Sequence, residues 1–118
     1  MSKPIYYLLE VEIKSGESDD FEALLKELIA TAQSEPTTLN YDVSLGEDGK
    51  TCHFFERFTD SEALAAHVGS FAKNFAERFL SVVTPTRLTV YGNPSDEAKK
   101  ALSGFGPVYM EPMGGFAR

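Results

Sequence analysis

The chain has 118 residues, the size of one domain with a single core. Its 18 acidic and 11 basic side chains give a formal net charge of −7, so neither nucleic acid nor an acidic membrane surface is an expected partner. The apolar runs are far too short to cross a bilayer, and no charged-then-apolar leader pattern opens the sequence, so a cytoplasmic location is expected.

The sequence contains none of the common cofactor motifs. No glycine-rich phosphate loop follows a strand pattern, and there is neither a CxxC pair nor an HExxH helix. Two histidines, His53 and His67, and the single Cys52 make a poor set of metal ligands, so no metal or other cofactor is expected. A single cysteine also excludes an internal disulfide.

The first 36 residues predict a strand followed by a helix. Over residues 5–14 the odd-numbered positions are all apolar, which indicates a strand with one buried face. The even-numbered positions are apolar at one end and charged at the other, which is typical of a face that is half covered, for example by another subunit. Apolar residues then recur every three or four positions to about residue 33, and Pro36 blocks continuation of this helix.

Two strands and a second helix come next. Residues 38–45 and 51–58 alternate as strands, and the loop between them contains Asp48-Gly49, a pair that tolerates the positive φ of a hairpin. Where the second of these strands ends, the period of the apolar pattern changes from two to about 3.6. A helix is therefore predicted over residues 60–80.

The rest of the chain predicts a fourth strand and an extension. The strand covers residues 87–91 and completes a domain over residues 1–92. In the C-terminal extension, residues 93–118, Ser95 is expected to cap a short helix, and a short edge strand is expected at residues 108–110. The aromatic and methionine side chains of the extension are costly to leave in water, so it should pack on its own domain or on a partner subunit.

The order of these elements predicts the fold. It is β-α-β-β-α-β, which indicates a ferredoxin-like α+β fold with a four-stranded antiparallel sheet. Two helices cover one face of the sheet, and the other face keeps Tyr6, Leu8 and either Phe54 or Phe55 without a helix to shield them. A single sheet would expose this apolar patch, so a homodimer with facing sheets is expected.

Several short motifs resemble the antibiotic biosynthesis monooxygenase (ABM) family of dimeric α+β barrels. They are Glu35-Pro36, Tyr41, Phe55-Glu56-Arg57-Phe58-Thr59-Asp60 and Ala63-Leu64 followed by Ala66-His67. The resemblance covers residues 5–91, and the chain departs from it after Pro36, where glycine is usual. Members of this family include cofactor-independent monooxygenases that oxidise quinols or polyphenolic intermediates with O₂. Others degrade haem or rearrange small carbonyl compounds.

The resemblance implies a cofactor-independent monooxygenase that acts on a small aromatic or quinol-type compound. Two alternatives stay open. One is a non-catalytic dimer that binds a small apolar metabolite, and the other is a haem-binding or haem-degrading relative. The haem-degrading branch uses an asparagine and a tryptophan beside a histidine, whereas this chain has no tryptophan and no asparagine in its first strand.

His67 is the candidate catalytic residue. It lies at the edge of the apolar stripe of the second helix beside Phe71, and a helical projection places Asn74 and Arg78 on the same side. An imidazole that titrates near neutral pH can take the hydroxyl proton of a phenolic substrate and so ease its reaction with O₂. The alternative is a histidine at the edge of the core, hydrogen-bonded to a backbone carbonyl or to Glu56.

Glu56 shares its strand parity with the buried aromatic residues, so it is expected to point into the layer between helices and sheet. A half-buried carboxylate there must be paired or protonated, and it can orient His67 or form an ion pair with Arg57 or Arg87. Tyr7 and Tyr41 lie on apolar strand faces, where they offer hydroxyls to a ligand or fill the core. The candidate substrate-binding residues are Tyr7, Tyr41, Glu56, Phe71, Asn74 and Arg78.

Overall fold

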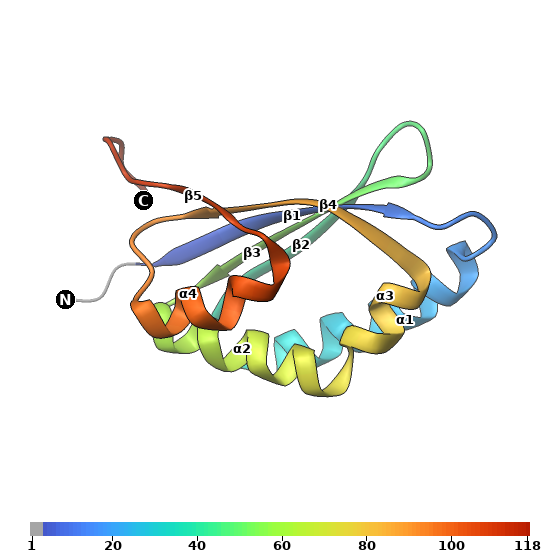
Figure 1. Cartoon of the computed structure of the whole chain (residues 1–118), viewed down its shortest axis with the longest axis horizontal. Helices are drawn as coiled ribbons and strands as arrows, with labels where there is room; N and C mark the ends of the chain where they lie inside the picture. Colours follow the sequence, from blue (N-terminus) through green and yellow to red (C-terminus); the bar gives the residue numbers. More distant parts are fainter. Residues whose placement is uncertain (1–3) are drawn as a thin grey trace.

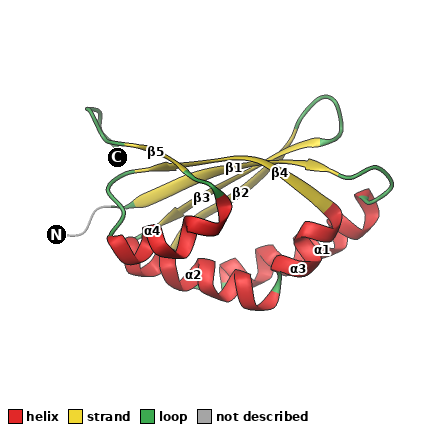
Figure 2. Cartoon of the chain, viewed as in Figure 1, coloured by secondary structure: helices red, strands yellow, loops and turns green. Residues whose placement is uncertain are grey.

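The computed structural model describes residues 4–118 and has two layers, a sheet and a set of helices that all lie on one of its faces (Figure 1). Within this range the sheet has five strands, in the spatial order β2-β3-β1-β4-β5. The strands are β1 (Ile5–Ile13), β2 (Thr38–Leu45), β3 (Thr51–Phe58), β4 (Val83–Tyr91) and β5 (Val108–Met110). The helices, drawn red in Figure 2, are α1 (Ser18–Gln33), α2 (Ser61–Asn74), α3 (Ala76–Val82) and α4 (Asp96–Leu102), and a 3₁₀ turn at Ser103–Phe105 follows α4.

The core order β-α-β-β-α-β is ferredoxin-like, as the sequence predicts. The prediction of a four-stranded antiparallel sheet was wrong, because the sheet has five strands and is mixed. β1 pairs antiparallel with β3 and β4, and β2 pairs antiparallel with β3, but β5 pairs in parallel with β4. The connection from β4 to β5 passes through α4, and such a helical crossover returns the chain in the same direction.

The helix predicted over residues 60–80 is two helices, α2 and α3, that meet at Phe75. Asp60 caps α2, and its carboxylate accepts a hydrogen bond of 2.9 Å from the Ala63 amide. At the break Phe75 has a φ of −132°, outside the helical range. Leu64 of α2 and Phe79 of α3 are both buried, so each helix contributes to the core.

β3 alternates strictly between the two faces of the sheet. Its even-numbered residues, Cys52, Phe54, Glu56 and Phe58, are buried under the helices. Phe54 packs edge to face against Phe21, Tyr41 and Phe79, with ring centroids 5.6–6.2 Å apart. Phe55 points the other way.

The open face is the face of the sheet that no helix of residues 4–118 covers (Figure 1). A row of aromatic side chains lies on this open face. The ring of Tyr6 stacks on Tyr91 with centroids 5.0 Å apart, and it lies 5.7 Å from Phe55 on the other side. Val108 and Met110 of β5 are exposed and share the parity of Tyr91, so they extend this apolar surface.

The extension after β4 folds back onto the domain. Ser95 caps α4, and its hydroxyl accepts a hydrogen bond of 3.2 Å from the Ala98 amide. The helix buries Ala98 and Leu102 against the core that includes α2. β5 then runs beside β4. Beyond it, Met113 and Phe116 are exposed. No helix of the described residues 4–118 is long and apolar enough to cross a membrane.

Candidate functional site

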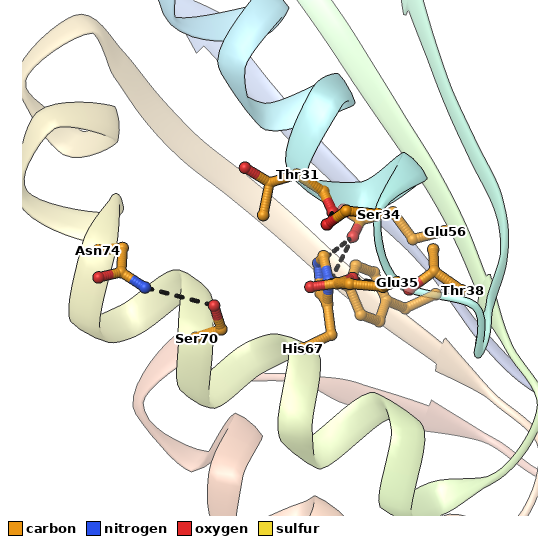
Figure 3. A network of polar contacts seen from close by, with 9 residues as sticks. Thr31, Ser34, Glu35, Thr38, Glu56, His67, Ser70 and Asn74 are labelled. Carbon is orange, nitrogen blue, oxygen red and sulfur yellow. Dashed lines mark hydrogen bonds and ion pairs between the residues drawn. The ribbon is translucent and has the colours of Figure 1, made fainter.

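A polar cluster lies between the helices and the sheet (Figure 3). The ring of His67 has a carboxylate on each side: Nδ1 is 2.7 Å from Glu35 Oε1, and Nε2 is 2.9 Å from Glu56 Oε1. The hydroxyl of Tyr7 donates a 2.7 Å hydrogen bond to the same Oε1 of Glu56. We call Tyr7, Glu35, Glu56 and His67 the polar cluster.

Four elements bring these side chains together. Tyr7 in β1 and Glu56 in β3 are direct partners in the sheet register, so their side chains point to the same face. His67 reaches them from the middle of α2. Glu35 lies in the turn after α1, where the Thr38 hydroxyl donates to its Oε1 at 2.8 Å and fixes the carboxylate.

Exposure increases from one end of the cluster to the other. The exposed fraction of the side chain is 4% for Glu56, 10% for His67 and 22% for Glu35. Burial alone would lower the pKa of His67, but the hydrogen bonds and charges of Glu56 and Glu35 together outweigh it, and the pKa is raised. The two carboxylates therefore favour the imidazolium form of His67 relative to a free histidine.

The tyrosines of the site stay protonated. Burial, followed by the charge of Glu56, raises the pKa of Tyr7 well above its ordinary value. Burial and the same carboxylate raise the pKa of Tyr41, whose ring meets the imidazole edge-on at 6.1 Å. Both phenols therefore remain hydrogen-bond donors across the physiological pH range. Burial also raises the pKa of the Cys52 thiol to about 11, which keeps it neutral.

The raised pKa of His67 predicts how stability depends on pH. The folded chain binds this proton more tightly than the unfolded chain, so the stabilisation is complete below about pH 6.5 and is lost as the pH rises through the folded-state pKa. Urea unfolding of the wild type and of His67→Gln should show a stability difference that shrinks from pH 6 to 8, by at most about 1.4 kcal/mol per pH unit. A difference that is constant or grows with pH would contradict the raised pKa.

An apolar cavity adjoins the polar cluster. The volume of this cavity is about 30 Å³. Glu56, His67, Tyr7 and Tyr41 form its polar part. The rest of the wall is apolar and consists of Leu9, Phe54, Val68, Phe71, Phe79, Leu88, Leu102 and Phe105. A mostly apolar cavity with a few converging polar groups is the usual composition of a small-ligand site.

Of the residues predicted for the site, His67, Tyr7, Tyr41, Glu56 and Phe71 line this cavity.

Asn74 and Arg78, also predicted for the site, lie elsewhere. The amide of Asn74 donates to Ser70 at 3.4 Å near the far end of α2 (Figure 3), and Arg78 forms a 2.6 Å ion pair with Glu27 of α1. The helical projection placed Arg78 beside His67 because it assumed one continuous helix, and the break at Phe75 invalidates that assumption.

Eight residues of the site carried no functional prediction: Glu35 and the apolar wall residues Leu9, Phe54, Val68, Phe79, Leu88, Leu102 and Phe105. Glu35 belongs to the Glu35-Pro36 motif, but it lies in a turn, where no period indicates the direction of a side chain. Leu102 ends the seven-residue helix α4, and Phe105 stands between Gly104 and Gly106, so neither belongs to an apolar period long enough to indicate where its side chain points.

The cluster is not arranged around a metal. Among residues 4–118, no group of three or more His, Cys, Asp or Glu side chains is placed to hold a metal ion. The geometry of the imidazole explains this for the polar cluster. Its two nitrogens point away from each other, so Glu35 and Glu56 lie on opposite sides of the ring and do not converge on one point.

Solved structures share this fold. The structure of MupZ from Pseudomonas fluorescens is 24% identical, with a TM-score of 0.86 over 100% of this chain and 91% of that chain. Rv0793 from Mycobacterium tuberculosis is 26% identical, with a TM-score of 0.68 over 80% of this chain and 97% of that chain. SnoaB, a cofactor-independent oxygenase from Streptomyces nogalater, is 12% identical, with a TM-score of 0.65 over 75% of this chain and 91% of that chain.

Sequence comparison gives a more direct result. No curated protein sequence matches the chain. The model of the family described as antibiotic biosynthesis monooxygenase matches residues 4–72, which is more than half of the 118 residues. The protein therefore belongs to the antibiotic biosynthesis monooxygenase family.

Proposed function

We propose that the protein is a cofactor-independent monooxygenase that acts on a small aromatic or quinol-type compound. Family membership supports this reaction class, since members of the family include cofactor-independent oxygenases. The observation that carries the proposal is the position of Glu56. Its carboxylate is almost fully buried, lines the cavity and contacts His67, so a base is available where water is scarce.

In the proposed reaction, Glu56 and His67 take the hydroxyl proton of the substrate together. The substrate O–H bond breaks, Glu56 receives the proton, and the carboxylate passes it from Oε1 to Nε2 of a neutral imidazole. Two carboxylates stabilise the resulting imidazolium, which favours the transfer. Glu35 accepts from Nδ1 and so fixes the tautomer, which is the part that the orienting carboxylate plays in a catalytic triad.

The electron-rich phenolate then reduces O₂, the oxidant of this reaction. The peroxide that forms on the substrate takes back the proton stored on His67. Loss of water then leaves one oxygen atom in the product as a carbonyl, and the two hydrogens of the water come from the substrate. The apolar wall keeps bulk water from the anion and the peroxide.

Oxygen uptake tests the proposal. A panel of hydroquinones should give slow O₂ consumption with the wild type, and His67→Ala should lower it by about 100-fold or more, because the proton acceptor is lost. Unchanged turnover in that variant would contradict the role of the imidazole. Thermal stabilisation by the same compounds without any O₂ uptake would favour a non-catalytic binding protein.

A haem-dependent reaction is not favoured. Both imidazole nitrogens of His67 contact carboxylates at 2.7 and 2.9 Å, so coordination of haem iron would have to break one of these ion pairs. A Soret band that appears on titration with haem and disappears in His67→Ala would contradict this view.

The proposal includes a homodimer that pairs the open faces of two chains. Tyr6, Phe55 and Tyr91 form an aromatic surface that a second copy would bury. At micromolar concentration the wild type should sediment with twice the 13.0 kDa of one chain, and Phe55→Glu should sediment as one chain. Leu45→Glu, a matched change at an exposed apolar residue near the hairpin, should stay dimeric. A compact wild-type monomer would contradict the dimer.

A further inference from the structure

The cavity is too small for an aromatic ring. It offers about 30 Å³, whereas a protein cavity of about 150 Å³ is the size that binds benzene. If the proposed function is right and the substrate is aromatic, part of the wall must give way when the substrate binds. The inference that follows rests on that function, and it concerns which part of the wall moves.

Most of the wall is rigidly held. Phe54 belongs to a central strand, Val68 and Phe79 to helices packed on the sheet, and all three are buried. Moving any of them would open the core, at a cost comparable with that of a large core substitution. Phe105 differs, because it is partly buried and lies in the short 3₁₀ turn that follows α4, whereas the other partly buried residues of the wall belong to strands or to α2.

Few atoms pack against the backbone on either side of Phe105. Gly104 and Gly106 flank it, and a Cβ atom built on either glycine would meet no atom within 4 Å. Gly106 has a φ of +61°, a conformation that L-residues other than glycine adopt at a cost. The turn is anchored at both ends, by the buried Leu102 before it and by β5 paired to β4 after it.

Phe105 also contacts the polar side of the site through one neighbour. Its ring centroid is 6.4 Å from that of Phe71, and Phe71 lines the cavity together with His67. The ring of Phe105 therefore fills space directly beside the proposed substrate position. The family match ends at residue 72, so this part of the wall lies outside the matched segment.

We propose that Phe105 is the specificity-determining residue of the site, whose ring sets the size of the aromatic compound that the cavity admits. In the wild type the ring gives way far enough to admit a compound with one aromatic ring, and a larger compound stays excluded. When the ring is removed, a fused two-ring compound fits into the freed volume and gains apolar contact.

Binding of 1-naphthol and of phenol, without O₂, tests this proposal apart from turnover. Because the chain has no tryptophan, naphthol excited at wavelengths longer than tyrosine absorbs reports binding without interference from the protein. Phe105→Ala should bind 1-naphthol at least about tenfold more tightly than the wild type, whereas affinity for phenol should change less. Phe105→Leu should fall between the two. Phe116→Ala, the same change at a residue of the extension that is 82% exposed, should behave like the wild type.

Equal naphthol affinity in Phe105→Ala and the wild type would overturn the proposal. Failure of both proteins to bind naphthol would overturn it as well. A similar gain in Phe116→Ala would show a general loosening of the extension and would overturn it as well. The outcomes for the proposed function are separate. If Phe105→Ala binds naphthol more tightly but no quinol supports O₂ uptake by the wild type, the role of Phe105 is supported and the proposed oxygenase function is contradicted. If the wild type oxidises quinols but Phe105→Ala does not change naphthol affinity, the proposed function is supported and the role of Phe105 is contradicted.

Discussion

Replacing Glu56 with glutamine is expected to lower turnover of a hydroquinone with O₂ by about 100- to 10,000-fold, the usual contribution of a positioned acid or base. The amide has nearly the same shape and still accepts the hydrogen bond of Tyr7, which ends on Oε1. It cannot accept a proton from the substrate, and it removes one of the two charges that stabilise the imidazolium. The loss should therefore appear in kcat, with the fold intact.

Glu10→Gln is the matched control. Glu10 also faces a histidine across the sheet, with its Oε1 3.5 Å from Nε2 of His53, but this pair is much more exposed than that of Glu56 and His67. Glu10→Gln should keep wild-type turnover. In the wild type, turnover should rise with pH through the raised pKa of His67, because only the neutral imidazole accepts the proton. Glu56→Gln with wild-type kcat would contradict the assignment of the base.

Replacing Phe54 with alanine is expected to reduce the free energy of unfolding by about 3–5 kcal/mol. Phe54 is fully buried and packs against three other aromatic rings, so its removal leaves a void that the central strand cannot close. Such a loss is a large part of the 5–15 kcal/mol by which a domain of this size is stable. Urea unfolding monitored by far-UV circular dichroism measures it.

Phe116→Ala makes the same substitution at an exposed position and should change stability by less than about 0.5 kcal/mol. Phe54→Leu should lose less than Phe54→Ala, because more of the buried volume is kept. If Phe54→Ala and Phe116→Ala were equally stable, Phe54 would not be at the centre of the core.

The alternation of side chains along a strand explains why the sequence predicts Tyr7 and Glu56 for the site. Alternation in β3 places Glu56 among buried residues, and alternation in β1 places Tyr7 on the same face. Their hydrogen bond follows from that shared face once the strands pair in register. His67 follows in the same way from the apolar stripe of α2.

The helix capped by Ser95 and the strand at residues 108–110 were predicted, but the direction of Glu35 and the way the extension packs could not be predicted from a period. Glu35 reaches His67 from a turn, and its direction depends on the hydrogen bond from Thr38 and on the contact with His67 itself. The strand at residues 108–110 was expected, but three residues are too few to indicate that it pairs in parallel with β4. Arg78 was misplaced for a different reason. Its predicted position assumed that the helical period continues past Phe75, where the sequence does not mark the break between α2 and α3.

The account depends most on an imidazole held between two carboxylates beside an apolar cavity. Proton–carbon NMR of the imidazole ring measures the pKa of His67 directly. In His53→Gln the signals of His67 are the only histidine signals to assign. The account predicts that His67 titrates above pH 6.5 and that Glu35→Gln lowers its pKa. A midpoint at or below pH 6.5 in the otherwise unchanged chain would contradict it.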